Sequence, residues 1–121
     1  MILPRVAFVA GLFAATTAYA HETAGRHGGQ VTDAGKFHVE LVAKGETVDV
    51  FLSDEGQKPI PASGFKGTAV LVVGGKPTRV PLEPAEGNRL TGKAATMLGD
   101  SPKGAVQLTD PDGATASGKF N

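Results

Sequence analysis

The sequence contains no cysteine and no tryptophan, and it has no excess of either charge. Without cysteine, neither a disulfide framework nor a thiolate metal site can form, and a lipid anchor on an amino-terminal cysteine is excluded. Lysine and arginine together number 12, as do aspartate and glutamate, so the net charge is zero. Because a nucleic-acid binder needs a basic surface, this balance argues against that class of protein.

Motifs of catalysis are also missing. No serine stands in a Gly-x-Ser-x-Gly elbow, and there is no cysteine nucleophile. Gly74-Gly75-Lys76 lacks the flanking residues of a phosphate loop. The carboxylate pairs Asp54-Glu55 and Asp110/Asp112 lie in predicted turns, where they shape the backbone. We therefore predict a protein that is not an enzyme.

The first twenty residues have the features of a secretory signal peptide. Arg5 supplies the positive charge, Val6 to Ala15 is an uncharged and mostly apolar run, and Ala18-Tyr19-Ala20 is a small-x-small cleavage site. A transmembrane helix needs roughly 20 apolar residues, so this run is too short. We predict cleavage after Ala20, which leaves 101 of the 121 residues as a periplasmic or extracellular chain without stable membrane insertion. The alternative is an uncleaved anchor.

The full sequence contains 17 glycines and 8 prolines, and most of them divide the remainder of the chain into short segments. Seven or eight apolar-alternating runs recur at intervals of about 8–12 residues, which is typical of a β-sandwich. We predict one all-β domain over residues 30–121, a small antiparallel, immunoglobulin-like β-sandwich, with a small open barrel as the alternative. The predicted core positions are Phe37, Val39, Leu41, Val48, Val50, Leu71 and Val73.

Three segments carry more specific expectations. The continuous apolar run within Lys66 to Val73 indicates burial on both faces or a central strand. Pro77 and Pro81 favour an edge position for the strand that follows. Ala94 to Asp100 is the one segment after the signal peptide that we expect to form a helical turn.

All three histidines lie within the eighteen residues from His21 to His38. Residues 21–29 are polar and rich in glycine, which predicts a flexible arm. Imidazole binds copper, zinc and nickel, and of these copper(II) most tightly. After cleavage, the α-amine and ring of His21 can chelate one ion together. We predict a copper(II) or zinc site made of His21, His27, His38 and Glu40.

The first hairpin decides whether these ligands meet. The link Asp33-Ala34-Gly35 predicts a three-residue hairpin turn with glycine last. Glu40 then faces Gly28 and His27 faces Leu41, so His27 and His38 lie on opposite faces of the sheet. A bulge at Gly28-Gly29, or an arm that leaves the sheet there, would remove this separation, and the sequence leaves both options open.

Several short motifs together resemble a known family. They are His27-Gly-Gly29, Phe37-His-Val-Glu-Leu41, Val48-Asp-Val-Phe-Leu-Ser-Asp54 and Lys58-Pro59. This pattern resembles the small N-terminal β-domain of periplasmic adaptor subunits of heavy-metal efflux pumps, and related short stand-alone periplasmic proteins. The resemblance implies a periplasmic role in heavy-metal efflux or tolerance, with a pump component as partner and His27 as a ligand. The coiled-coil, lipoyl and barrel domains of an adaptor are missing, so this chain cannot bridge a pump and a channel alone.

A looser resemblance is to periplasmic copper carriers of the copper-resistance type, whose mature chains also begin with histidine. Their methionine-rich loop is not matched, since Met97 is the one methionine left after cleavage. We therefore expect a protein that buffers or delivers copper or zinc. The alternative is a non-catalytic structural or interaction module that docks on another envelope protein through a free edge or apolar patch near Lys66 to Val73.

Overall fold

The structure is a computed structural model that describes residues 23–121. The predicted signal peptide and His21 lie outside the described residues. Within this range the chain forms only strands and turns, and no helix has the length and hydropathy needed to cross a membrane. The strands are β1 (Thr23–Ala24), β2 (Gln30–Ala34), β3 (Phe37–Lys44), β4 (Thr47–Ser53), β5 (Lys66–Val73), β6 (Lys76–Pro84), β7 (Arg89–Lys93), β8 (Lys103–Thr109) and β9 (Thr115–Phe120).

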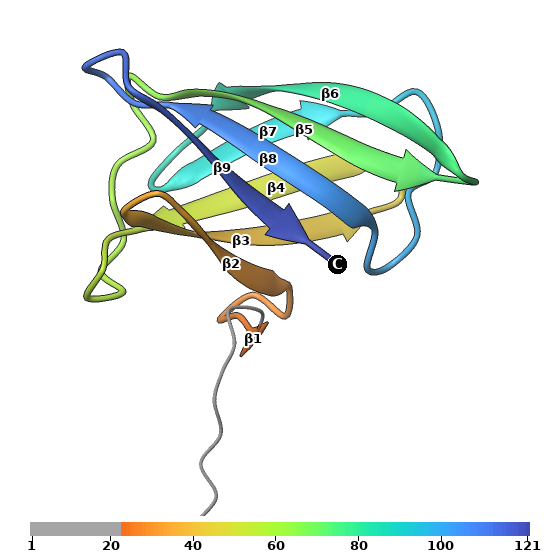
Figure 1. Cartoon of the computed structure of the whole chain (residues 1–121), viewed down its shortest axis with the longest axis horizontal. Helices are drawn as coiled ribbons and strands as arrows, with labels where there is room; N and C mark the ends of the chain where they lie inside the picture. Colours follow the sequence, from red (N-terminus) through yellow and green to blue (C-terminus); the bar gives the residue numbers. More distant parts are fainter. Residues whose placement is uncertain (1–22) are drawn as a thin grey trace, which may run out of the picture.

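Every strand pairs antiparallel with its neighbours, in the order β1-β2-β3-β4-β7-β6-β5-β8-β9. One layer holds β1 to β4 with β7, and the other holds β6, β5, β8 and β9 (Figure 1). β6 joins the layers, because it pairs with β5 along Lys76 to Leu82 and with β7 through Glu83 and Pro84. The predicted all-β antiparallel fold is confirmed, and the sandwich is nearly closed into a barrel.

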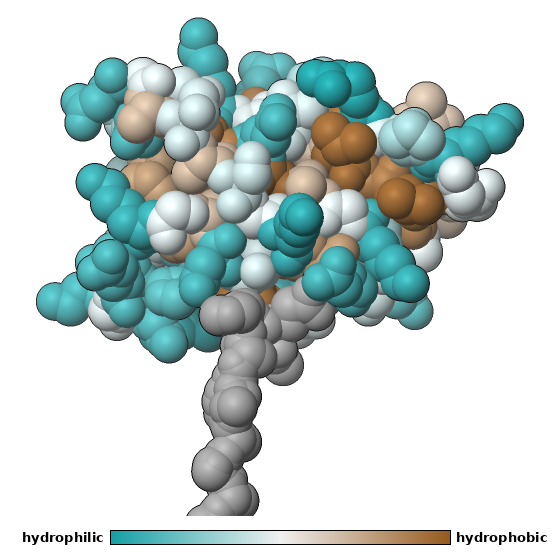
Figure 2. Space-filling model, viewed as in Figure 1, coloured by the Kyte–Doolittle hydropathy of each residue, from teal (hydrophilic) through white to brown (hydrophobic). Residues whose placement is uncertain are grey.

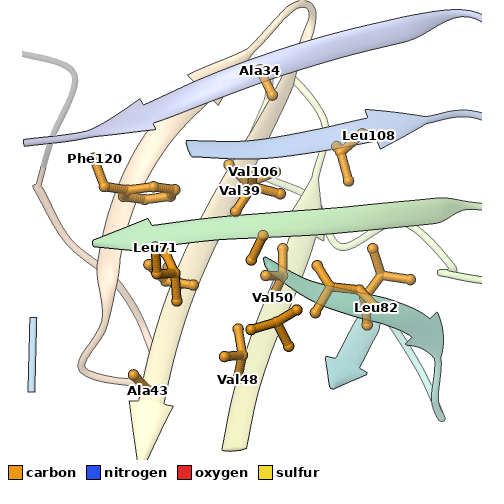
Figure 3. Close-up of a cluster of buried hydrophobic side chains, with 14 of the residues drawn as sticks. Ala34, Val39, Ala43, Val48, Val50, Leu71, Leu82, Val106, Leu108 and Phe120 are labelled. Atoms are coloured by element: carbon orange, nitrogen blue, oxygen red, sulfur yellow. The ribbon is translucent and has the colours of Figure 1, made fainter. Parts of the chain in front are cut away.

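The core lies between the two layers. Alternating residues of β3 and β4 point inward, where they meet the inward side chains of β5, β8 and β9 (Figure 3). Five of the seven predicted core residues are buried, and Phe37 and Val73 pack against the core while remaining partly exposed. The confirmed residues are Val39, Leu41, Val48, Val50 and Leu71.

The predicted turn of the first hairpin is wrong. Gly35 and Lys36 form a two-residue turn, and Ala34 pairs with Phe37. Gly35 has φ +62°, the left-handed conformation that the first position of such a turn requires and that glycine adopts without strain. The pairing therefore shifts by three residues, so Glu40 faces Val31 instead of Gly28.

The predicted helical turn at Ala94 to Asp100 is also wrong. The amides of Ala94 and Leu98 donate to the carbonyls of Glu46 and Gly45, at 2.7 and 2.9 Å, in the turn between β3 and β4. These bonds replace the i to i−4 bonds of a helix. Ala94 and Leu98 are buried, so this irregular segment covers one end of the core.

β5 is central in its layer, between β6 and β8, which was one of the two expectations for its apolar run. Its outer face is not covered, and the Val72 side chain is 46% exposed. Figure 2 shows small groups of apolar side chains among hydrophilic ones on this side of the molecule. β6 has the partial edge character expected from its prolines, since its pairing with β7 is limited to its last two residues.

Candidate metal-binding site

The candidate site lies on the outer face of the layer that contains β2, β3 and β4. Because Val39 and Leu41 point into the core, His38 and Glu40, which alternate with them along β3, point outward. Glu40 faces Phe51 of β4 on one side and Val31 of β2 on the other. The strand alternation thus brings charged and aromatic side chains together on one surface.

The segment 25–29 folds over this face as a tight loop. The Gly25 amide donates to the Gly29 carbonyl at 2.9 Å, and the Gly28 amide donates to the Gly25 carbonyl at 3.1 Å. Gly28 adopts φ +80°, which favours glycine. Before the loop, β1 pairs with the outer edge of β2. The loop leaves the β2–β3 ladder and returns His27 to the same face as His38, which answers the question that the sequence left open.

The Glu40 carboxylate accepts three hydrogen bonds from this loop. Its Oε2 accepts the backbone amides of His27 and Gly29, each at 2.8 Å, and its Oε1 accepts Nδ1–H of His27 at 2.9 Å. The Glu40 side chain is only 8% exposed. A buried carboxylate is stable only when its oxygens are satisfied, and here the loop satisfies both of them.

His27 is held on two sides. Its ring stacks on Phe51 with 3.7 Å between the ring centroids and 6° between the planes. A carboxylate oxygen only accepts hydrogen bonds, so Nδ1 carries a proton, and in a singly protonated ring Nε2 keeps its lone pair. Within residues 23–121, Nε2 has no hydrogen-bond partner, and the side chain is 44% exposed. The ring is therefore oriented with a free nitrogen that solvent can reach.

His38 has the same arrangement on the neighbouring strand. Its Nδ1 lies 2.8 Å from Oδ1 of Asp33, which is its cross-strand partner on β2. The His38 side chain is 28% exposed. The carboxylate again fixes the proton on Nδ1 and leaves Nε2 as the nitrogen that can bind an ion.

Both histidines line one pocket of about 320 Å³. Arg26 borders this pocket and donates to the Gln57 carbonyl at 3.4 Å. Gln57 is the one residue other than glycine within the described range that has a positive φ, +66°. The remaining lining residues are Gly25, Val31, Val39, Glu40, Phe51, Ser53, Pro59 and Asn88.

A second polar cluster lies on the same sheet, around Arg89. Its guanidinium donates to Asp49 and Glu86, both at 3.0 Å, and the Thr91 hydroxyl donates to Asp49 at 2.7 Å. These hydrogen bonds, first to Asp49 and then to Glu86, raise the pKa of Arg89. A backbone hydrogen bond, followed by Arg89, lowers the pKa of Glu86. The charges in this cluster are paired with one another, which makes it a structural feature.

Of the predicted ligands, the structure brings His27, His38 and Glu40 to one face, while His21 lies outside the described residues. Among residues 23–121, no three side chains of histidine, aspartate or glutamate are grouped closely enough to hold an ion by themselves. Sequence reasoning missed Phe51 and Asp33. An outward aromatic residue between the inward Val50 and Leu52 was the available signal for Phe51.

Comparison of the chain with protein-family models, curated proteins and solved structures gave no match.

Proposed function

We propose that this protein is a periplasmic metal-binding protein that buffers or delivers copper(II) or zinc, linked to heavy-metal efflux or tolerance. The observation that carries the proposal is that two histidines on one face each donate Nδ1–H to a carboxylate. Histidines that bind metals have this arrangement almost always, because the carboxylate orients the ring and makes Nε2 more basic. We assign Nε2 of His27 and Nε2 of His38 as ligands.

The charges around the pocket agree with a divalent cation. Both imidazole rings line the pocket, and the carboxylates of Glu40 and Asp33 contact their Nδ1 atoms. Together the two carboxylates offset a charge of +2. Arg26 opposes a cation, but its guanidinium is bonded to the Gln57 carbonyl. Copper(II) and zinc both accept imidazole nitrogens, and the choice between them depends on the other ligands.

Glu40, which the sequence predicts as a ligand, has a different role in this proposal. Both of its oxygens are occupied by the loop, so it orients His27 and leaves the coordination to the rings. The α-amine and ring of His21 are the candidates for the remaining positions. Water can complete the coordination of the ion, since the pocket is far larger than an ion.

The test is a titration of the mature protein with zinc and with copper(II), followed by calorimetry. His27→Ala and His38→Ala should each weaken binding at least tenfold, which corresponds to about 1.4 kcal/mol. Gln107→Ala, on an exposed part of β8, is the control and should bind like the native protein. If the native protein binds neither ion more tightly than about millimolar, or if both histidine variants bind normally, the proposal is wrong.

A one-residue extension before His21 tests the amino-terminal chelate. The extension keeps every side chain and replaces the α-amine with an amide that gives up its proton reluctantly. Copper(II) favours a tetragonal set rich in nitrogen, so copper(II) affinity should fall at least tenfold. His21→Ala should lower the copper(II) affinity by at least the same factor. Equal affinities of the native, extended and His21→Ala proteins would show that His21 is not a ligand. The site of His27 and His38 is tested by its own variants above.

A further inference from the structure

We propose that Glu40 is a positioning residue that fastens the 25–29 loop to the sheet, so that loop closure and metal binding stabilise each other. The metal part of this inference rests on the proposed function. The fastening itself rests on contacts within the described residues. Glu40 is the anchor on β3, and the 25–29 loop is the part that it holds.

The fastening is concentrated on one side chain. All three hydrogen bonds to the Glu40 carboxylate come from residues 27–29. The loop also lies directly on the carboxylate, since a Cβ atom added to Gly25 would overlap the Glu40 carboxyl carbon. Hydrogen bonds to a charged acceptor contribute more than neutral ones. Loss of this carboxylate would therefore remove the main polar attachment of the loop and leave the Phe51 stack and the Arg26–Gln57 hydrogen bond.

The metal adds a second attachment between the same two parts. His27 belongs to the loop, whereas His38 belongs to β3. An ion that binds Nε2 of both residues joins the loop to the sheet. Because such an ion binds the closed loop and not the open one, it stabilises closure by mass action. By the same linkage, any change that opens the loop must weaken metal binding through His27.

Arg26 provides a direct measure of loop opening. Its side chain is exposed, and trypsin cleaves after arginine. In the closed loop, the amide of the Arg26–His27 peptide bond donates to Glu40, so cleavage requires the loop to open. Limited proteolysis with mass spectrometry, which detects the new amino terminus at His27, therefore reports the population of the open loop.

The first experiment needs no metal. Glu40→Gln should increase the rate of cleavage after Arg26 at least tenfold in metal-free protein, while Glu83→Gln on the exposed side of β6 should leave it unchanged. Gly25→Ala is the second variant, because it leaves Glu40 intact and opens the loop by steric overlap. Its matched control is Gly56→Ala, whose added Cβ makes only an ordinary 3.4 Å contact with Asp54. Native cleavage rates in both Glu40→Gln and Gly25→Ala would overturn the fastening.

The second experiment tests the coupling with zinc as the probe. Zinc at about 100 times its Kd should slow cleavage of the native protein at least tenfold. Glu40→Gln should weaken zinc binding at least tenfold in the native background and by less than twofold in the His27→Ala background, because Glu40 acts through His27. An equal loss in both backgrounds would overturn the positioning role. If the native protein binds no zinc, the proposed function and the coupling fail together, whereas the metal-free cleavage rates still decide the fastening.

Discussion

At the scale of single residues, the candidate site depends on carboxylates that bind ring nitrogens. Glu40 is buried and Asp33 is half-exposed, yet each lies within 2.9 Å of a histidine Nδ1. A hydrogen bond of this kind selects the tautomer and fixes the ring plane. The difference in burial predicts different roles. Glu40 also holds the loop backbone, whereas Asp33 acts on His38 at the sheet surface.

Asp33→Asn should therefore weaken zinc binding without unfolding the protein. The amide keeps the size of the side chain and removes the carboxylate that orients the His38 ring through Nδ1. Loss of such a partner typically lowers metal affinity 10–100-fold, and we expect a loss of about tenfold. Calorimetric titration measures the affinity. Asp49→Asn is the control, because it removes a carboxylate from the same face whose partners are Arg89 and Thr91. Equal affinities of the two variants would contradict the assignment of His38.

The residue types of the site could be predicted from the sequence, but their partners could not. The concentration of histidine pointed to His27 and His38, and alternation along β3 put Glu40 beside His38 on one face. The partners depend on strand register, and a shift of three residues in one hairpin moves Val31 opposite Glu40 and Asp33 opposite His38. That shift follows from the φ of Gly35, which the three-residue pattern did not reveal.

At the scale of elements, β4 connects the core to the site. It pairs with β3 and β7, and it directs Val50 inward while Phe51 lies outward under His27. Apolar alternation was enough to predict that Val48 and Val50 of this strand face the core. The prediction of a helical turn at 94–100 failed because amides of this segment bond to the turn at Gly45 and Glu46. This turn is distant in the sequence, so no local pattern reveals the contact.

Val50→Asp tests the facing of β4. Val50 is 0% exposed, so an aspartate there would be a buried charge without a partner. We expect a loss of at least about 3 kcal/mol in unfolding free energy, which lowers the Tm by more than about 12 °C in a domain of this size. Thermal denaturation followed by circular dichroism is the measurement.

Val72→Asp is the matched control for this prediction. It makes the same chemical change on β5, at a side chain that is 46% exposed. The loss in unfolding free energy there should stay below about 1 kcal/mol, as for most surface substitutions. Similar melting temperatures for the two variants would mean that the inward face of β4 is wrongly assigned.

At the scale of the whole molecule, the second strand and the last strand meet. β9 packs against β2, and Gly118 lies directly against the Asp33 carbonyl and the Thr32 methyl group. This contact closes the side of the sandwich opposite to β6. A Cβ atom at Gly118 would lie 2.8 Å from both of those atoms, closer than real Cβ contacts allow.

Gly118→Ala should therefore destabilise the protein by pushing β9 away from β2. Overpacking of this kind typically costs about 1–3 kcal/mol. Chemical denaturation with urea measures the loss, and Ser117→Ala, on the exposed side of the same strand, should change stability by less than about 0.5 kcal/mol. A native stability for Gly118→Ala would show that the β2–β9 contact is loose.

The meeting of β2 and β9 also imposes an order in time. Chains are synthesised from the amino terminus, so β2 exists long before β9. Until β9 arrives, the hairpin that carries Asp33, His38 and Glu40 lacks the contact of β2 with Gly118. The histidine site therefore gains its stable support only when the last six-residue strand is in place. A chain that lacks this strand would display its histidines on a sheet without the β2–β9 contact.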